Sequence, residues 1–496
     1  INFLRCSVKM ALNMQQQITI AAWAITYAND REAARRARLV HLDFKGAPPR
    51  IRYLEKLFPL IAAAGATAIL VEYEDMFPYE GSLANVSARN AYSKSEIYAL
   101  ISAAKLNNLQ VIPLIQTFGH LEFVLKLPEF KHLRELPSFP QELCPLNPKS
   151  LDSLVYEMLK QVMMLHSTSK YMHIGCDEVY HMGACSKCSH VDTKELFANH
   201  VASISRFIRE SYPGVTPLIW DDMLRRWSPA DHAKWGLGEL VEPVVWVYAD
   251  DIHSLLPHFA WHAYRRTFSH IWTAGAYKGA SGETALVPEV QKHHLNTVSW
   301  LSIMKNCSGC KGYILTGWSR YDHFAVLCEL LPVSVPSLIH NLLLASRGDT
   351  HHIPKFLNCP QSMYISLDSK SFHSQFSKCN FPGSDALLAI NNLSVLKSMV
   401  KELRKKTGGW ISSYNIRYNF SSPMRILQCL SEVTQLSREI TAYRDKTENV
   451  LLEYIDSFSV SEWLEQRLQP LQDEIIALEQ SMQNLMDKDT WPRRPL

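Results

Sequence analysis

Short apolar runs alternate with helical patterns between residues 38 and 335. The runs are rich in β-branched and aromatic residues, and each ends in polar ones; they fall at 38–43, 67–73, 109–115, 171–175, 216–221, 242–248, 268–274 and 312–318. Continuous apolar strands that alternate with helices are typical of a parallel sheet covered on both faces. Eight such units close into a barrel, so the pattern predicts an α/β fold, a (β/α)8 TIM barrel.

The segments between these runs carry helix signals. Ser93 and Glu96 have the spacing of a capping box, and an i, i+3, i+4 apolar stripe runs over 151–163. After about residue 335 the strand pattern stops, and long helical periodicity appears over 424–456 and 460–488. The predicted domains are a 1–37 N-terminal extension, a 38–340 catalytic barrel, a 341–385 irregular linker and a 386–496 helical C-terminal domain.

Composition is that of a globular protein with a large core. Of 496 residues, 47% are hydrophobic and 20% charged, with a formal net charge of +3. The basic residues are dispersed except for a short cluster over 31–38, so we expect no nucleic-acid partner. The apolar stretch Ile18–Ala28 is too short to cross a bilayer, so we expect no membrane partner. A homodimer is one assembly that the sequence leaves open.

The eleven cysteines are an odd number scattered over a long chain. This favours reduced thiols and a cytoplasmic or nuclear location. Two Cys-x2-Cys pairs, Cys185/Cys188 and Cys307/Cys310, could in principle supply zinc ligands. They lie about 120 residues apart in different predicted loops, so we expect free thiols there, with a redox role as an alternative, and no metal.

Polar and aromatic residues gather where the predicted strands end, at the mouth where barrel enzymes build their sites. They are Glu72, Glu74 and Asp75; Gln116, Thr117 and His120; Asp177 and Glu178; Trp220, Asp221 and Asp222; Trp246 and Tyr248; Trp272; and Trp318, Arg320, Tyr321 and Asp322. Carboxylates with a ring of tryptophans indicate a carbohydrate site. Indoles pack against the apolar faces of sugars, and an oxocarbenium-like transition state needs a proton donor and nearby negative charge.

The segment from His173 to Glu178, HIGCDE, resembles the His-x-Gly-x-Asp-Glu signature of the family 20 glycoside hydrolases, the β-N-acetylhexosaminidases. Further segments resemble one branch of that family in the same order over 38–340: VHLDFKGAPP, EYEDMFPYEG, PLIQTFGHLEFVLK, PLIWDDML, VEPVVW and ILTGWSRYDHFAVLCELLP. The resemblance implies an exo-acting, retaining hydrolase whose substrate's own 2-acetamido group is the nucleophile. Terminal β-linked GalNAc and GlcNAc are the implied substrates, and no cofactor is needed.

The resemblance implies a role for each matching residue. Glu178 is the expected general acid and base, Asp177 the residue that orients the acetamido group, and His120 the neighbour that tunes the acid. Two adjacent carboxylates also resist ionising together. The expected substrate-binding residues are Trp220, Asp221, Trp246, Tyr248, Trp318, Asp322 and Glu74.

Departures from the family pattern bear on sugar specificity. Lys45 lies where other members carry a sugar-binding Arg, and Arg320 lies where they carry an acid, whose contacts Asp322 or Asp221 could take over. The branch that the chain resembles favours GalNAc. A sugar-binding paralogue without turnover stays open as the alternative. A metal-dependent barrel hydrolase is disfavoured, because Val40-His41-Leu42 lacks the His-x-His ligands expected on the first strand.

Overall fold

The computed structural model describes residues 36–496 except 361, 362, 364 and 368. The apolar stretch Ile18–Ala28 and nearly all of the predicted N-terminal extension lie outside the described residues. No helix in the described part of the chain is long and apolar enough to cross a membrane.

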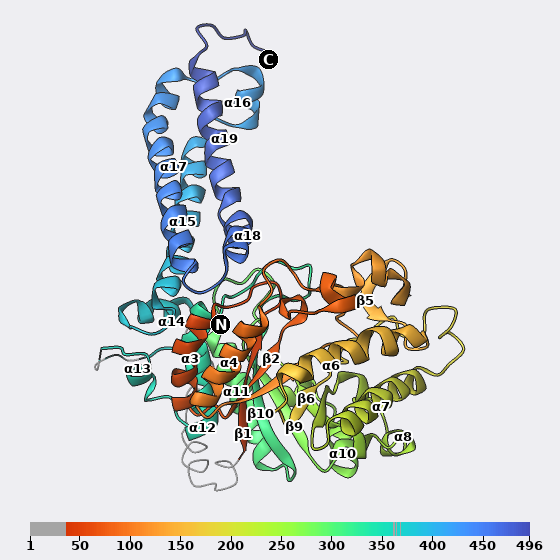
Figure 1. The fold of residues 1–496 in the computed structure, drawn as a ribbon. Helices are drawn as coiled ribbons and strands as arrows, with labels where there is room; N and C mark the ends of the chain where they lie inside the picture. Colours follow the sequence, from red (N-terminus) through yellow and green to blue (C-terminus); the bar gives the residue numbers. More distant parts are fainter. Residues whose placement is uncertain (1–35, 361–362, 364, 368) are drawn as a thin grey trace, which may run out of the picture. The chain divides into compact units, whose positions relative to one another are not determined.

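Eight parallel strands form a closed barrel, as the sequence predicts (Figure 1). The strands are β1 (Ala37–Asp43), β2 (Ala68–Glu72), β3 (Gln110–Leu114), β6 (Tyr171–His173), β7 (Thr216–Trp220), β8 (Glu242–Trp246), β9 (Ile271–Lys278) and β10 (Cys310–Gly317). Neighbours pair in chain order, and β1 closes the barrel on β10 with Leu39 opposite Ile314. Two strands outside the barrel, β4 (Arg134–Leu136) and β5 (Phe139–Leu143), form an antiparallel hairpin.

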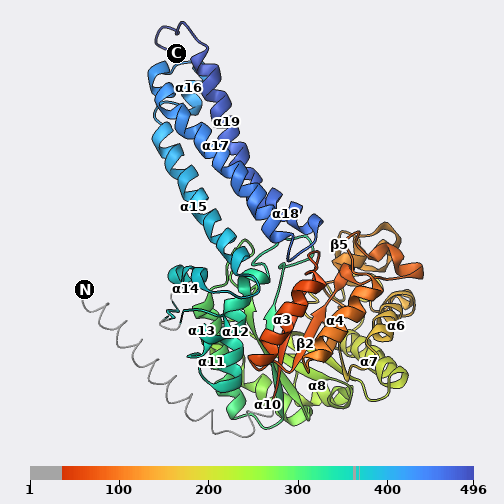
Figure 2. The same ribbon diagram turned by 60° about the vertical axis from the view of Figure 1, so that its left-hand side comes forward.

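Helices surround the barrel on its outside (Figures 1 and 2). They are α3 (Ile51–Ala63), α4 (Lys94–Leu106), α5 (Glu122–Leu125), α6 (Tyr156–Leu165), α7 (Thr193–Ser211), α8 (Pro229–Lys234), α9 (Leu237–Leu240), α10 (His258–Thr267), α11 (Val290–Lys305) and α12 (Val335–Arg347). The predicted capping box is present at α4, where the Ser93 hydroxyl accepts from the Glu96 N–H and the Glu96 carboxylate accepts from the Ser93 N–H. Strand residues such as Leu70 and Leu218 fill the interior.

One predicted strand end is wrong. The seventh barrel strand runs from Ile271 to Lys278, not from 268 to 274, because α10 continues to Thr267 and the next three residues connect it to the strand. Trp272 therefore lies at the start of the strand, away from the mouth. Its ring is buried, and its Nε1–H donates to Glu242 Oε2 at 2.7 Å. Trp272 is part of the barrel core and does not belong to the tryptophan ring.

The segment predicted as a linker contains more structure than its composition indicates. Helix α12 continues to Arg347, and α13 (Ile353–Phe356) and α14 (Ser369–Gln375) follow it. Phe372 and Phe376 are fully buried, so this segment contributes to a core.

A second compact unit spans Gly383–Leu496. It consists of α15 (Ser384–Thr407), α16 (Ser413–Tyr418), α17 (Pro423–Leu451), α18 (Ser457–Arg467) and α19 (Gln469–Met486); the long helices α15, α17 and α19 lie side by side (Figure 2). The predicted single helix 460–488 is two helices. The chain breaks at Leu468, just before Pro470, whose ring and missing N–H favour the first turn of a new helix.

The prediction of free thiols at Cys307 and Cys310 is also wrong, because these residues form a disulfide. Gly309 lies between them with φ +88°, a conformation that allows the tight turn. A second disulfide joins Cys359 to Cys379, on either side of α14. Six other cysteines of the described residues are free: Cys144, Cys176, Cys185, Cys188, Cys328 and Cys429.

Candidate active site

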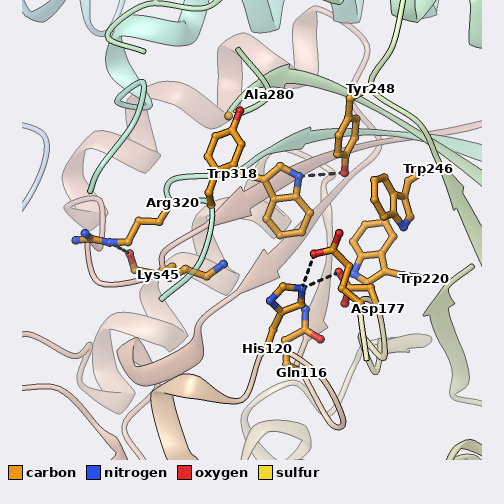
Figure 3. A pocket seen from close by; sticks show the side chains of 13 residues that line it. Lys45, Gln116, His120, Asp177, Trp220, Trp246, Tyr248, Ala280, Trp318 and Arg320 are labelled. Carbon is orange, nitrogen blue, oxygen red and sulfur yellow. Dashed lines mark hydrogen bonds and ion pairs between the residues drawn. The ribbon is translucent and has the colours of Figure 1, made fainter. Parts of the chain in front are cut away.

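A pocket of about 290 Å³ opens at the C-terminal ends of the barrel strands (Figure 3). It is lined by Lys45, Gln116, His120, Asp177, Glu178, Trp220, Trp246, Tyr248, Gly279, Ala280, Trp318, Arg320 and Tyr321. Its walls are mainly aromatic, and its ionisable groups are concentrated where His120, Asp177 and Glu178 meet. Seven of the ten predicted site residues line it: His120, Asp177, Glu178, Trp220, Trp246, Tyr248 and Trp318.

The chain after β6 takes up an uncommon conformation that aims the carboxylates. Gly175, Cys176 and Glu178 have φ values of 65°, 69° and 50°. Left-handed backbone at non-glycine residues is uncommon and concentrates at functional sites. Another residue at position 175 would be strained at this positive φ, and its Cβ would displace the Gln116 side chain, whose Oε1 would lie 1.9 Å away. His173 supports the turn because its Nδ1 accepts the Gly175 N–H at 3.0 Å.

The loop after β3 packs against this turn through a second glycine. A Cβ at Gly119 would lie 2.3 Å from the Asp177 carbonyl oxygen, so only glycine permits the approach. The next residue, His120, also has positive φ and points its imidazole at the two carboxylates. Its Nε2 lies 3.5 Å from Asp177 Oδ2 and 3.3 Å from Glu178 Oε2. The Gly-His sequence thus holds one ring against two acids.

The pKa shifts of the three groups that meet here, His120, Asp177 and Glu178, differ in direction or in cause. Burial alone would lower the pKa of His120, but the Asp177 charge and the hydrogen bond to Glu178 raise it to about 10, so the ring is an imidazolium at neutral pH. Burial raises the pKa of Asp177. The hydrogen bond from His120 lowers the pKa of the more exposed Glu178. One cation therefore balances two carboxylates, and a proton moving to or from Glu178 changes the net charge of the triad.

Asp177 has an unused acceptor. Its side chain is 9% exposed, and Oδ2 faces His120. The other oxygen, Oδ1, is buried and has no hydrogen-bond partner among the residues that the structure describes. A buried carboxylate oxygen without a donor is costly, so this atom is suited to accept an N–H from a bound molecule.

The two aspartates after β7 point in different directions. Asp222 faces the site: Oδ2 accepts the Glu178 backbone N–H at 2.9 Å, and Oδ1 accepts Trp246 Nε1–H at 3.2 Å. Asp221 is fully buried behind the wall, where it accepts two hydrogen bonds from Arg225, each at 2.8 Å, and one from the Tyr264 hydroxyl at 3.0 Å. Asp222 therefore holds the Glu178 backbone and the Trp246 ring. Asp221 holds the Trp246 backbone, whose N–H it accepts at 3.2 Å, and anchors Arg225, whose guanidinium lies 4.8 Å from the Trp246 ring centroid.

Three indoles and a phenol form the aromatic wall. Trp220 and Trp318 are 6.0 Å apart between ring centroids, and Trp246 lies 5.2 Å from Tyr248. Trp318 Nε1–H donates to the Tyr248 hydroxyl oxygen at 3.0 Å, which fixes the two rings relative to each other (Figure 3). Such a wall offers apolar faces against which a ligand can pack.

Lys45 is the second cation of the pocket. It follows β1, and Nζ lies 3.4 Å from Glu74 Oε1 and 5.4 Å from the Trp318 ring centroid. Burial alone would lower the pKa of Lys45, but Asp43 and Glu74 raise it well above its usual value, so it stays charged. Arg320 lines the pocket differently, since its guanidinium donates to the Lys45 and Ala325 carbonyl oxygens and points away from the indoles (Figure 3).

Three predicted site residues lie outside the pocket lining. Asp221 is buried behind it, as described above. Glu74 pairs with Lys45 and with His323 Nδ1 at 2.9 Å. Asp322 is exposed and caps a turn by accepting the N–H groups of Phe324 and Ala325. Asp322 and Asp221, the two acids expected to compensate for Arg320, therefore do not line the pocket.

An eight-stranded barrel whose mouth holds adjacent carboxylates, a half-buried imidazolium and an aromatic wall is the arrangement of a glycoside hydrolase. Comparison with known proteins gives the family. The model of the glycosyl hydrolase family 20 catalytic domain matches residues 55–239. Hexosaminidase D of Homo sapiens is 39% identical over 92% of this chain and 96% of its own length. Hexosaminidase D of Bos taurus is 46% identical over 63% of this chain and 92% of its own.

The chain belongs to glycosyl hydrolase family 20, and it is a glycoside hydrolase of the β-N-acetylhexosaminidase type. Among solved structures, a β-N-acetylhexosaminidase from Bacteroides fragilis is similar with a TM-score of 0.48 and 15% identity, over 63% of this chain and 66% of that one.

Proposed function

We propose that this enzyme removes terminal β-linked GalNAc, and also GlcNAc, from glycoconjugates by a retaining, substrate-assisted mechanism. The observation that carries the proposal is the buried Asp177 carboxylate, which faces His120 through Oδ2 and leaves Oδ1 without a partner beside Glu178. This oxygen can accept a hydrogen bond from the N–H of an acetamido group. A simple hexose carries a hydroxyl at carbon 2 in place of the acetamido group, so it has no amide carbonyl that could serve as nucleophile.

The first step forms an intermediate within the sugar. The acetamido carbonyl oxygen attacks the anomeric carbon while the glycosidic carbon–oxygen bond breaks, and Glu178 gives its proton to the leaving oxygen. The resulting oxazolinium ring carries a positive charge, which the Asp177 carboxylate stabilises through the N–H. In the second step Glu178 takes a proton from water as the water oxygen attacks the anomeric carbon, and the bond from this carbon to the acetamido oxygen breaks and restores the acetamido group. Two inversions at this carbon give net retention.

The other pocket residues bind and orient the sugar. Trp220, Trp246 and Trp318 enclose the acetamido methyl and one face of the ring, and the Tyr248 hydroxyl donates to the acetamido oxygen. Lys45 supplies a charged donor for sugar hydroxyls in the place of the family's Arg. The preference for GalNAc over GlcNAc rests on the resemblance to hexosaminidase D and stays a prediction.

A substrate panel tests the function. Wild-type protein is assayed with p-nitrophenyl β-GalNAc, β-GlcNAc and β-galactoside, the last of which lacks the acetamido group. We expect turnover of the first two, a larger kcat/KM for GalNAc, and none for the galactoside. Asp177→Asn keeps the shape but not the charge, and we expect it to lose most of the turnover while still binding a GalNAc-thiazoline inhibitor.

The alternative is a sugar-binding paralogue without turnover. It is favoured by the lowered pKa of Glu178, which keeps this residue ionised at neutral pH in the free protein. Binding of the thiazoline by calorimetry with no hydrolysis at any pH supports the alternative. The absence of both thiazoline binding and hydrolysis would contradict both the hydrolase and the sugar-binding paralogue.

Location and assembly are also proposals. The free thiols at six described positions favour a cytoplasmic or nuclear location, whereas the two disulfides do not. Imaging of the tagged full chain tests the location, and light scattering in solution tests whether the chain forms a homodimer.

A further inference from the structure

Three thiols converge next to the active-site loop. Cys144 directly follows β5, and Cys185 and Cys188 lie in the loop between β6 and α7. The Cys144 sulfur lies 3.6 Å from that of Cys185 and 3.5 Å from that of Cys188. Cys144 and Cys188 are 3% and 0% exposed, and the surrounding side chains include Leu196 and Met182. The three sulfurs therefore share one site, in which Cys144 and Cys188 are buried and Cys185 is half-buried.

The spacing of the sulfurs fits a tetrahedral ion. Zinc–sulfur bonds of about 2.3 Å give a tetrahedron with edges of about 3.8 Å. The two measured separations are a few tenths of an ångström shorter than this edge and far longer than a disulfide bond of about 2.05 Å. The Cys185–Cys188 turn, closed by the Cys188 N–H donating to the Cys185 carbonyl at 3.1 Å, provides two ligands from one short segment.

A fourth ligand is present. Glu135, in β4, is 1% exposed, and its Oε1 accepts the Cys185 N–H at 2.9 Å. Its Oε2 is buried and has no hydrogen-bond partner within the described part of the chain. This carboxylate and the three sulfurs offer ligand atoms that all lie within 4.8 Å of one another. A buried carboxylate oxygen is stable only when a donor or a cation accompanies it, so the site lacks a positive charge.

We propose that Glu135, Cys144, Cys185 and Cys188 bind a structural zinc ion. Three thiolates and one carboxylate complete a four-coordinate site and leave no open position, which is typical of structural zinc. The sequence hypothesis paired Cys185 and Cys188 with Cys307 and Cys310 and so disfavoured zinc. In the fold the third sulfur comes from Cys144 instead.

Among the residues that the structure describes, a second grouping of possible metal ligands, Glu74, Asp75 and His323, does not support the same inference. Lys45 Nζ lies 3.4 Å from Glu74 and Lys126 Nζ lies 3.6 Å from Asp75, so protein cations already neutralise these carboxylates.

Zinc would fasten the loop that carries the catalytic pair. Asp177 and Glu178 stand in the same β6–α7 segment as Cys185 and Cys188, whereas Cys144 and Glu135 belong to the β4–β5 hairpin region. Glu142 in β5 already joins the two, since Oε1 accepts the Tyr180 N–H at 2.9 Å. The ion adds a stronger connection to these hydrogen bonds, and its role is to position the loop, not to take part in the reaction.

Metal analysis of the full chain tests the site. We expect protein purified under reducing conditions without chelator to contain about one zinc per chain by inductively coupled plasma mass spectrometry. Cys144→Ser and Cys188→Ser should lose it, and Glu135→Gln should retain zinc less tightly against a chelator. Cys328→Ser and Cys429→Ser are the matched controls, because both remove a buried free thiol elsewhere and should keep the metal.

Cobalt gives a readout that does not depend on activity or on the folding of a variant. Wild-type protein stripped of zinc and reloaded with Co²⁺ should show thiolate-to-cobalt charge transfer and the strong visible bands of a tetrahedral site. Wild-type protein without zinc that also fails to show these bands overturns the proposal. So does a disulfide between Cys144 and Cys185 or Cys188 that forms again with zinc present once the reductant is removed, which would indicate a redox pair, or zinc that survives in Cys188→Ser.

Discussion

The most informative single substitution is His120→Gln, because His120 sets the protonation of both carboxylates. The imidazolium lies 3.3 Å from Glu178 Oε2, and the Glu178 side chain is 35% exposed. Two unit charges at this distance attract by about 1.3 kcal/mol at the permittivity of water, and by about 5 kcal/mol at an effective permittivity of about 20. The exposure of Glu178 favours the lower value, which corresponds to about one pKa unit.

The sign of the effect follows from the proposed role. The general acid must be protonated, so kcat/KM falls as pH rises through the pKa of Glu178. In the wild type His120 lowers that pKa, which places the decline in kcat/KM on the acidic side of neutrality. Removal of the cation should raise the pKa of Glu178 and move the alkaline limb up by about one pH unit. The maximal kcat/KM should fall, because the imidazolium no longer orients the two acids.

The assay is kcat/KM for p-nitrophenyl β-GalNAc from acid to neutral pH. His181→Gln is the matched control, since His181 also pairs with a carboxylate, that of Glu142 at 3.0 Å. His181 lies in the loop that carries Glu178 but does not line the pocket. It should leave the limb unchanged. An alkaline limb that stays in place in His120→Gln, or moves to lower pH, refutes the assignment of His120 and Glu178.

Three further predictions concern other parts of the site and the core. Glu178→Gln should lower kcat/KM for an alkyl β-GalNAc glycoside by about 10²–10⁴, and for a dinitrophenyl glycoside far less, because a good leaving group needs little protonation; equal losses contradict the role of general acid. Asp222→Asn keeps only one of two acceptors, so kcat/KM should fall about tenfold, whereas Asp221→Asn should chiefly lower the melting temperature. Trp272→Phe should lower the free energy of unfolding by about 1–3 kcal/mol, measured in urea, with KM unchanged.

The barrel could be predicted from the sequence because its signal is local and repeated. Each strand is a short apolar run followed by a helix, and the HIGCDE segment places both carboxylates at one strand end. One limit was the position of the strand ends. A start three residues later in β9 moved Trp272 from the mouth to the opposite end, and periodicity cannot fix a strand end to that accuracy.

The direction in which a side chain points was a second limit on the prediction. Asp221 and Asp222 are neighbours of the same type, and only the turn after β7 decides that Asp222 faces Glu178. The alternation of side chains along a strand was the available signal, since Trp220 points into the barrel and the next residue away from it.

Long-range contacts were the third limit. The Cys-x2-Cys spacing was visible, but nothing in the chain pattern joined it to Cys144, 41 residues before Cys185. The guanidinium of Arg320 likewise looked like a change in the pocket's charge, and the fold turns it to backbone carbonyls instead. Such pairings depend on how loops from different strands pack.

Participation of the acetamido group is tested most directly by weakening it as a nucleophile. The kcat/KM of the wild type is measured for p-nitrophenyl β-GalNAc and for its N-fluoroacetyl, N-difluoroacetyl and N-trifluoroacetyl analogues. Each fluorine withdraws electrons from the carbonyl oxygen, so the account predicts a steep decrease along the series. A kcat/KM that does not change with fluorination would contradict it, because the nucleophile would then be a protein side chain or water.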